Sequence, residues 1–259
     1  MKANYHTHTY RCNHASGSEE DYIKAAIKAG LEEIGMSDHC PWPIRKRYQM
    51  RMEMREFEPY VNELKRLKEK YKDQISIKLG LECEYFPNEW KTLRFFKEHP
   101  DLDYLIFGNH FHLQESSDWY YGTCVRDEEI LRHYVTDAVA GMETGYFRIF
   151  AHPDLCFRSY PVFDEAAKQA SYDICLKAKE LGVILEYNLG GLRMYRHEIP
   201  HYPRYEFWQA AAEVGNAVII GVDAHNPLDL LDQATYQQAE KTLQELGITN
   251  RIDKLEWSK

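Results

Sequence analysis

The stretch AVIIGVDAH, residues 217–225, couples a short apolar run to an acid and an imidazole. Six other places along the chain repeat this pairing. The apolar runs cover residues 3–5, 34–36, 75–81, 102–107, 147–151, 183–185 and 217–222, and the polar residues after them are His6 and His8, Asp38 and His39, Glu82 and Glu84, His110 and His112, His152 and Asp154, Glu186 and Asn188, and Asp223 and His225. Each run is predicted to be a strand. In an α/β barrel the reactive groups lie where strands meet their following loops, so these seven ends are expected to converge on one face.

Helical periodicity fills the intervals between the predicted strands. The capping-box pair Ser18 and Asp21 predicts a helix that Gly30 closes, and an apolar stripe predicts another over residues 59–72. Asp127 is expected to open a third helix, because acidic residues favour helix N-termini. Further helices are predicted over residues 164–181, with Gly182 as the C-cap, and over 205–214 and 234–246. This alternation favours the α/β class, with a parallel sheet closed or nearly closed into a barrel.

Composition limits the class of protein. The chain has 259 residues, of which 44% are hydrophobic, and this is enough for one large core. We therefore expect a single domain over residues 1–259. The six cysteines form no CxxC pair and no signal peptide precedes them, which predicts reduced thiols in the cytoplasm. No stretch reaches the roughly 18 to 20 apolar residues that a membrane-spanning helix needs.

The formal charge of −9 argues against nucleic acid as a partner, because such binding rests on clustered lysines and arginines. The conspicuous basic cluster, Arg45, Lys46, Arg47 and Arg51, lies among acidic residues and is interpreted as a mixed-charge loop or lid. Bound divalent cations would raise the charge of an acidic site. A small phosphorylated substrate is thus compatible with this composition, whereas the oligomeric state stays open.

Histidines and carboxylates provide the candidate metal ligands. His6 and His8 stand two residues apart, as a bidentate clamp requires. The other candidates are His14, Asp38, His39, His110, His152, Asp223 and His225, with at least one of Glu82 and Glu84. Imidazoles and carboxylates together suit Zn²⁺, Mn²⁺ or Fe²⁺. His112 is a weaker candidate, and His99 and His133 are expected to be surface or capping residues.

Several motifs together resemble those of the polymerase and histidinol phosphatase (PHP) superfamily. They are HTH at 6–8, HTYRCNH at 8–14, SDH at 37–39, GLE at 80–82, GNHFH at 108–112, AHPDL at 151–155 and GVDAH at 221–225. The resemblance spans nearly the whole chain. Within the superfamily, the length and the segments HTYRCNHASGS, SDHCPWP and EYNLGGLR are most similar to the stand-alone histidinol-phosphate phosphatases.

The resemblance implies a distorted seven-stranded, TIM-like (β/α) barrel that holds two to three divalent metals, Zn, Mn or Fe, at the carboxyl ends of its strands. The implied ligands are His6, His8, Glu82 and Asp223 for one metal, Glu82, His110 and His152 for a second, and His14, His39 and His225 for a third. It also implies hydrolysis of L-histidinol phosphate, in histidine biosynthesis, by a metal-bridging hydroxide. The expected catalytic residues are Asp223, Glu82 and His225, with Asp223 or a metal-bound water as the general acid.

Two arginines are candidates for binding the phosphate. Arg193 lies in a predicted loop with Gly190 and Gly191, and Arg158 follows the His152 motif. Their planar guanidinium groups suit bidentate contact with phosphate oxygens. The chain has Leu-Gly-Gly at 189–191 where the similar phosphatases tend to have Thr-Ser-Gly, which removes hydroxyl donors. The candidates for binding a substrate amine are Glu84, Asp154 and Glu186, each equally explained as a residue that orients a ligand.

Other functions compete with this interpretation. A member of the same superfamily could act on nucleotides, oligonucleotide ends or phosphotyrosine. A non-enzymatic accessory protein with a degraded centre is disfavoured, because every implied ligand position holds a competent residue. A cysteine-nucleophile phosphatase is also disfavoured, since none of Cys12, Cys83 and Cys156 begins a Cys-x5-Arg phosphate loop.

Overall fold

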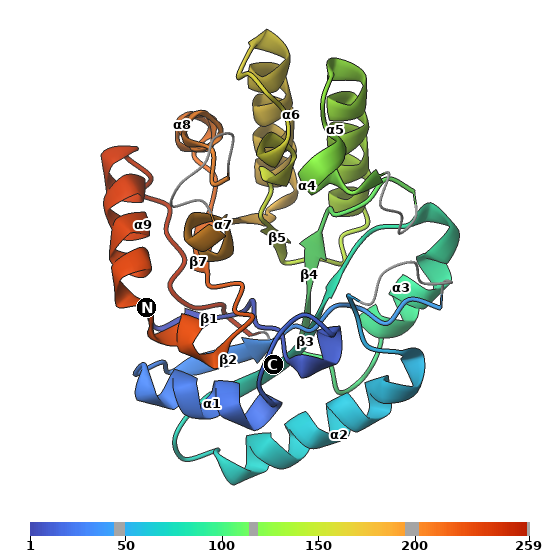
Figure 1. Ribbon diagram of the computed structural model, residues 1–259, viewed down its shortest axis with the longest axis vertical. Helices are drawn as coiled ribbons and strands as arrows, with labels where there is room; N and C mark the ends of the chain where they lie inside the picture. The colour runs from blue at the N-terminus through green and yellow to red at the C-terminus, as the bar shows by residue number, and fades with distance from the viewer. Residues whose placement is uncertain (44–49, 114–118, 195–201, 258–259) are drawn as a thin grey trace.

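A computed structural model describes residues 1–43, 50–113, 119–194 and 202–257. Its strands lie side by side in chain order, surrounded by helices (Figure 1). The strands are β1 (Ala3–Asn4), β2 (Glu33–Met36), β3 (Ser76–Cys83), β4 (Tyr104–Gly108), β5 (Ile149–Ala151), β6 (Ile184–Asn188) and β7 (Val218–Gly221). Each strand pairs in parallel with the next. The predicted nearly closed, seven-stranded barrel is confirmed.

The first and last strands meet through the residues that follow them. Thr7 and Ala224 form an isolated parallel bridge, and the His8 N–H donates to the Ala224 carbonyl at 2.9 Å. Deeper in the barrel, the buried side chain of Asn4 replaces backbone pairing, because its Oδ1 accepts the N–H of Val222 at 2.8 Å. These contacts bring the polar residues after β1 beside those after β7.

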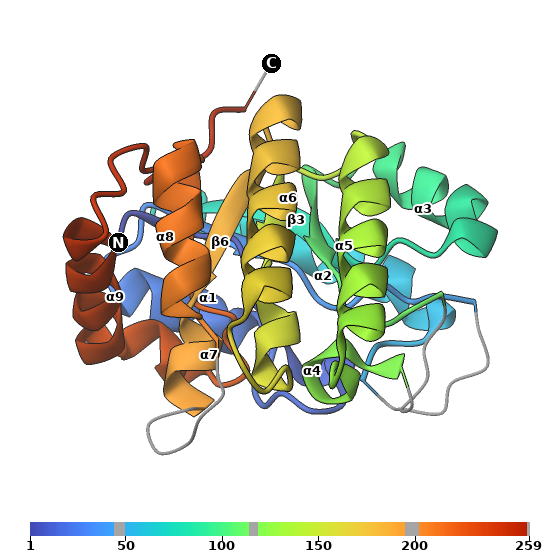
Figure 2. The same ribbon diagram turned by 90° about the horizontal axis from the view of Figure 1, so that it is seen from above.

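Helices cover the outside of the barrel, and α5, α6 and α8 lie side by side along one flank (Figure 2). The α-helices are α1 (Glu19–Lys28), α2 (Met54–Lys70), α3 (Trp90–Lys97), α4 (Tyr121–Cys124), α5 (Glu128–Glu143), α6 (Glu165–Leu181), α7 (Leu189–Met194), α8 (Tyr205–Val214) and α9 (Gln233–Glu245). Short 3-10 turns are η1 (Tyr10–Cys12), η2 (Pro87–Glu89), η4 (Leu155–Arg158) and η5 (Pro227–Leu231). The predicted caps at Ser18, Asp127 and Gly182 are present.

The α2 helix begins earlier than the sequence pattern predicts. The prediction starts at Pro59, and prolines are common in the first turn of helices. In the structure the helix starts at Met54, because the Glu56 carboxylate accepts the N–H of Glu53 at 2.7 Å and caps the preceding turn. Pro59 lies in the second turn, where its missing N–H costs one intrahelical hydrogen bond.

Two apolar clusters fill the fold. The larger one lies between the sheet and the surrounding helices. The smaller one gathers residues of the inner strand faces, with Tyr104 placed against Gly35 and Gly80, where a Cβ would lie within 3 Å of the tyrosine ring atoms. Leu255 closes this end, because its N–H donates to Tyr5 Oη at 2.9 Å. The barrel is thus packed at one end, and the polar strand ends face the other.

Two predictions about charge and location can be compared with this fold. Within the described ranges, no helix is long and apolar enough to cross a bilayer. Of the predicted basic cluster, Arg45, Lys46 and Arg47 lie outside the described residues. Assigning Arg51 to a mixed-charge loop or lid is wrong, because its side chain is fully buried against Glu84. All six cysteines are unpaired thiols.

Candidate metal centre

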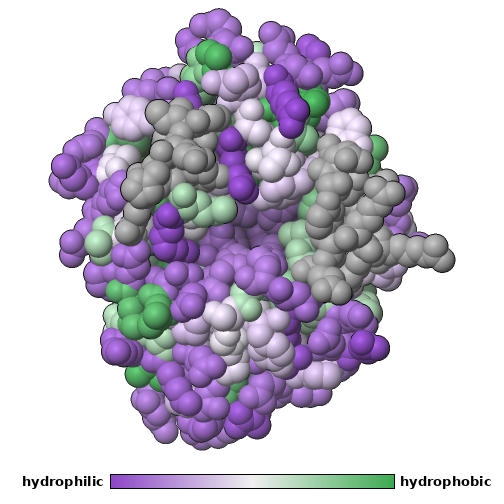
Figure 3. All heavy atoms as spheres, in the orientation of Figure 1, coloured by the Kyte–Doolittle hydropathy of each residue, from purple (hydrophilic) through white to green (hydrophobic). Residues whose placement is uncertain are grey.

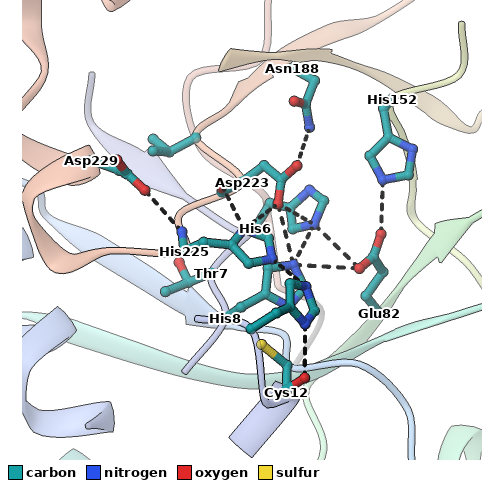
Figure 4. A network of polar contacts seen from close by, with 12 residues as sticks. His6, Thr7, His8, Cys12, Glu82, His152, Asn188, Asp223, His225 and Asp229 are labelled. Atoms are coloured by element: carbon teal, nitrogen blue, oxygen red, sulfur yellow. Dashed lines mark hydrogen bonds and ion pairs between the residues drawn. The ribbon is translucent and has the colours of Figure 1, made fainter. Parts of the chain in front are cut away.

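The predicted ligands lie together at the carboxyl ends of the strands. They are His6 and His8 after β1, His14 after η1, His39 after β2, Glu82 within β3, His110 after β4, His152 after β5, and Asp223 and His225 after β7. In Figure 4 the side chains of His6, His8, Glu82 and Asp223 converge on one region. This follows from the fold, because parallel strands present their carboxyl ends at one end of a barrel.

Glu82 is the centre of the cluster. Its Oε2 lies 2.9 Å from His39 Nδ1 and 3.4 Å from His8 Nε2. Its Oε1 lies 3.0 Å from His152 Nε2 and 3.2 Å from His110 Nε2. One carboxylate therefore faces imidazoles from four different strand ends, a position from which it could bridge two cations.

Imidazole nitrogens also face one another in pairs. The separations are 2.9 Å between His6 Nε2 and His8 Nε2, 2.9 Å between His14 Nε2 and His225 Nε2, and 3.3 Å between His110 Nε2 and His152 Nε2. Asp223 Oδ1 lies 3.3 Å from His8 Nε2 and 3.4 Å from His6 Nε2, and it is buried without a hydrogen bond. Buried polar atoms ordinarily have partners. Ring nitrogens that face one another in pairs, beside a buried carboxylate oxygen without a hydrogen bond, suit the ligands of a cation, so these residues fit a metal site.

Groups of three ligand atoms within 4.8 Å of one another mark where cations could sit. Examples are His6, His8 and Glu82; His6, His152 and Asp223; His8, His39 and His225; and Cys12, His14 and His225. The first group agrees with a predicted set. Cys12 is not among the ligands that the sequence predicts, although its place two residues before His14 is visible in the sequence. Burial raises the pKa of the Cys12 thiol to about 12.

The protonation states of Glu82, His39 and His8 suit cation binding, whereas at His110 the charge of Glu82 outweighs burial and raises the pKa to about 9. Burial by itself raises the pKa of Glu82, yet the positive charges of neighbouring histidines, His110 and His6 among them, outweigh it and lower the pKa well below its usual range. Burial lowers the pKa of His39 to about 3, and burial with the charge of His225 lowers the pKa of His8 well below its usual value. The carboxylate is therefore ionised and these imidazoles are neutral near pH 7, which are the forms that ligate metals.

Carboxylates behind the cluster hold the imidazoles in place. Glu186 lies 2.8 Å from His6 Nδ1 and accepts the N–H of His152 at 3.1 Å. Glu84 lies 3.0 Å from His110 Nδ1. Such contacts fix which nitrogen of a histidine faces the metal. The sequence left two roles open for Glu84 and Glu186, which were binding a substrate amine and orienting a ligand. Their buried contacts with histidines support the second role.

Two cluster residues have an uncommon backbone conformation. His152 has φ of 34° and Asp223 has φ of 49°, in the left-handed region that residues other than glycine rarely adopt. Such conformations cost roughly 1–3 kcal/mol and persist where the surroundings hold them. His152 directly follows β5 and Asp223 lies two residues after β7, so both conformations occur where the chain leaves a strand.

A cavity of about 520 Å³ opens beside the cluster, and Figure 3 shows a hydrophilic hollow in this face. Arg158, Arg193, Tyr120, Tyr202 and Asp229 are among the residues that line it. The loop predicted around Arg193 is the short helix α7, a correction to the prediction. A Cβ on Gly191 would lie 2.8 Å from Tyr202 Cε2, so a bulkier residue there would collide with the cavity wall.

Three other histidines have different partners. His112 lies 2.8 Å from Asp137 on α5, and its ring packs at a tilt of 36° against His133, with 4.5 Å between the ring centroids. His99 accepts the N–H of Asp101 at 3.3 Å. The expectation that His99 caps a turn is confirmed, and His112 has a partner on a helix in place of a ligand role.

Comparison with known proteins places the chain in a family. The PHP domain profile matches residues 4–190. A probable histidinol-phosphatase of Deinococcus radiodurans is 28% identical over 86% of this chain and 85% of its own, and one of Schizosaccharomyces pombe is 25% identical over 96% of this chain and 88% of its own. The protein belongs to the PHP domain family.

Solved structures share the fold. A histidinol phosphate phosphatase of Lactococcus lactis, solved with zinc, L-histidinol and phosphate, has a TM-score of 0.74 and 20% identity, with 98% of this chain and 99% of that chain covered. The putative histidinol phosphatase of Listeria monocytogenes has a TM-score of 0.71 and 20% identity, with 91% and 100% covered. These similarities support the predicted TIM-like barrel.

Proposed function

We propose that this protein is a metal-dependent phosphomonoesterase that hydrolyses L-histidinol phosphate to L-histidinol and phosphate, a step of histidine biosynthesis. The observation that carries the proposal is the cluster of seven histidines with Glu82 and Asp223 beside a cavity that contains two arginines. The names of the relatives in Deinococcus radiodurans and Schizosaccharomyces pombe support the substrate. The L-histidinol and phosphate bound to the Lactococcus lactis enzyme support it as well.

The proposed cofactor is two to three divalent ions of zinc, manganese or iron. The proposed ligand sets are those implied by the family: His6, His8, Glu82 and Asp223; Glu82, His110 and His152; and His14, His39 and His225. The fit of these residues rests on their converging lone pairs. When bound, such cations lower the pKa of water and offset the negative charge of a phosphate group.

In the proposed reaction, Asp223 transfers the proton, and Glu82 and His225 hold the neighbouring side chains in position. Burial raises the pKa of Asp223, but the charge of His6 and the close contact with His225 outweigh it and lower the pKa well below its usual range. Asp223 therefore starts ionised. In the proposed reaction its carboxylate accepts the proton released by the attacking water and returns it to the leaving alkoxide. Glu82 holds neighbouring imidazoles, and His225 holds Asp223 at 3.3 Å.

Arg193 is the arginine best placed for the phosphate. Its Nη2 donates to the carbonyls of Val222 at 2.7 Å and Asp223 at 3.0 Å, which fixes the guanidinium beside the cluster. Its Nη1 is buried without a hydrogen-bond partner while the residue lines the cavity. A phosphate oxygen would supply that partner. Arg158 lines the same cavity with Nη1 3.4 Å from Tyr120 Oη and is proposed as a second contact.

Phosphate release after chelation and separate reloading with Zn²⁺, Mn²⁺ or Fe²⁺ tests the activity. L-histidinol phosphate and a nucleoside monophosphate serve as paired substrates. The proposal expects metal-dependent turnover that strongly favours L-histidinol phosphate. Turnover of the nucleotide alone would keep the metal chemistry and reject the substrate, and no turnover with any metal would reject the enzyme.

Arg193→Ala tests the phosphate contact, with Arg126→Ala as its control. Arg126 is exposed and does not line the cavity. Loss of a hydrogen bond to a charged group costs about 1.5–3 kcal/mol, so kcat/KM should fall by roughly 10- to 150-fold in Arg193→Ala. Equal kcat/KM in the two variants would remove Arg193 from the mechanism.

The proposal also covers the number of domains, the cellular location and the binding partner. One continuous sheet supports a single domain over residues 1–259. The six free thiols support a cytoplasmic location, where disulfides are rare. The partner is a small phosphorylated molecule, and the acidic composition argues against nucleic acid.

A further inference from the structure

The three acids predicted to bind a substrate amine already contact other buried groups of the protein. Glu84 is ion-paired with Arg51 at 2.8 Å and is 1% exposed. Asp154 is fully buried and accepts the indole N–H of Trp208 at 3.1 Å. Glu186 faces His6, as described above. An ammonium group in the cavity therefore needs a different acidic partner.

Asp229 is the remaining acid that lines the cavity. Among the described residues that line it, the acids are Glu82, Asp223 and Asp229. The first two are candidate metal ligands, and a cation bound by them would repel an ammonium group. The Asp229 side chain is 22% exposed, so it is accessible from the cavity.

The geometry around Asp229 holds its carboxylate still. Oδ2 accepts the backbone N–H groups of His225 and Asn226, both at 2.9 Å, at the start of η5 (Figure 4 shows the contact with His225). Oδ1 lies 3.5 Å from Arg193 Nε. Two hydrogen bonds fix one oxygen, and the other oxygen faces the arginine that is proposed to bind phosphate. A held carboxylate loses little freedom when it binds a ligand.

We infer that Asp229 determines substrate specificity by binding the ammonium group of a 2-amino alcohol phosphate while the adjacent Arg193 binds the phosphate. In L-histidinol phosphate the ammonium carbon is bonded to the CH₂ that carries the phosphate ester. Opposite charges thus lie a few bonds apart in the substrate. In the cavity, the negative Asp229 lies beside the positive Arg193. The negative residue can therefore face the ammonium group while the positive residue faces the phosphate. This inference rests on the proposed function, because it assumes a phosphorylated amine as substrate.

The experiment compares two substrates that differ only in the amine. They are L-histidinol phosphate and 3-(imidazol-4-yl)propyl phosphate, which lacks the amino group. Asp229→Asn removes the charge and keeps an amide oxygen that can accept the N–H groups of His225 and Asn226. Asp232→Asn is the matched control, because Asp232 caps α9 and does not line the cavity.

The expected result is a loss of discrimination. The unmodified protein and Asp232→Asn should favour the amine-bearing substrate in kcat/KM by about 10- to 100-fold, as for a hydrogen bond between charged groups. In Asp229→Asn this ratio should fall to near one while turnover of the amine-free substrate is retained. If Asp229 only holds the His225 turn and Arg193, kcat/KM will fall equally for both substrates, and the inference is wrong.

A binding measurement separates this inference from the proposed function. Calorimetric titration with L-histidinol and with 3-(imidazol-4-yl)propanol needs no turnover. Weaker binding of L-histidinol alone in Asp229→Asn supports the ammonium contact even if phosphate release fails. Unchanged binding of both alcohols overturns the contact even if L-histidinol phosphate is hydrolysed. Absence of turnover in the unmodified protein counts against the proposed function instead.

Discussion

Replacing Arg51 by methionine is expected to destabilise the protein by about 3–5 kcal/mol, the usual cost of breaking a buried ion pair. Arg51 is fully buried, with Nη2 2.8 Å from Glu84 Oε1 and Nη1 3.2 Å from Glu84 Oε2. Nη1 also donates to the Cys40 carbonyl at 2.9 Å. Methionine fills much of the space of the arginine stem, so the main loss is the positive charge opposite Glu84.

Urea unfolding of the chelated protein measures this cost, with Arg94→Met as the matched control. The Arg94 pair with Glu98 has the same 2.8 Å separation, but its side chains are 53% and 61% exposed. Exposed pairs contribute about 0–1 kcal/mol. With a urea m-value near 3 kcal/mol/M, the buried pair corresponds to a midpoint shift of about 1–1.7 M. Equal shifts in the two variants would refute the reasoning.

The cost should also depend on pH. Burial raises the pKa of Glu84, but the charge of Arg51 and the contact with His110 outweigh it and lower the pKa below its usual range. Because the folded-state pKa is the lower one, this stabilisation is complete above the unfolded pKa of about 4.3 and is lost as the pH falls below it. The difference between the unmodified protein and Arg51→Met should therefore narrow in acid.

Three further predictions concern the metal site and a thiol. His152→Ala should lower the bound metal measured by elemental analysis, because His152 Nε2 lies 3.0 Å from Glu82, whereas the same change at His133 should leave the metal content unchanged. Gly190→Ala should weaken metal affinity by about 10- to 100-fold in a chelator competition, because its Cβ would lie 2.8 Å from Asp223 Oδ2; unchanged affinity would contradict this close approach. Partial burial raises the pKa of Cys124 to about 11, so its alkylation by iodoacetamide should be slow at pH 7 and rise about tenfold per pH unit, without a plateau near pH 8.5.

The sequence was sufficient to predict the barrel and the membership of the cluster. Each predicted strand is a short apolar run with residues of a ligand type at or just after its end, as in residues 217–225. Parallel strands put all such ends on one side of the barrel. The residues of the cluster can therefore be predicted without knowing which strands are adjacent. Helix boundaries are predicted correctly where a capping residue marks them in the sequence, as at Ser18 and Gly182. The predicted start of α2 is too late, because the prediction begins at Pro59 and misses the cap at Glu53.

The roles of the supporting residues depended on long-range contacts. Arg51 reads as one member of a basic cluster, yet it pairs with Glu84, which is 33 residues away in the sequence. Glu186 reaches His6 across 180 residues. Contacts between residues so far apart leave no periodic signal, because they depend on how separate strands are brought together.

By itself the sequence determined the class of fold, the types of candidate ligand and the end of the barrel where they meet, because strand periodicity and strand-end chemistry are local properties. Only the tertiary structure decided which groups remain available to a substrate. Glu84, Asp154 and Glu186 are taken up by buried partners, whereas Asp229 reaches the cavity beside Arg193. That distinction depends on burial and on distances between separate elements, which are set when the barrel closes.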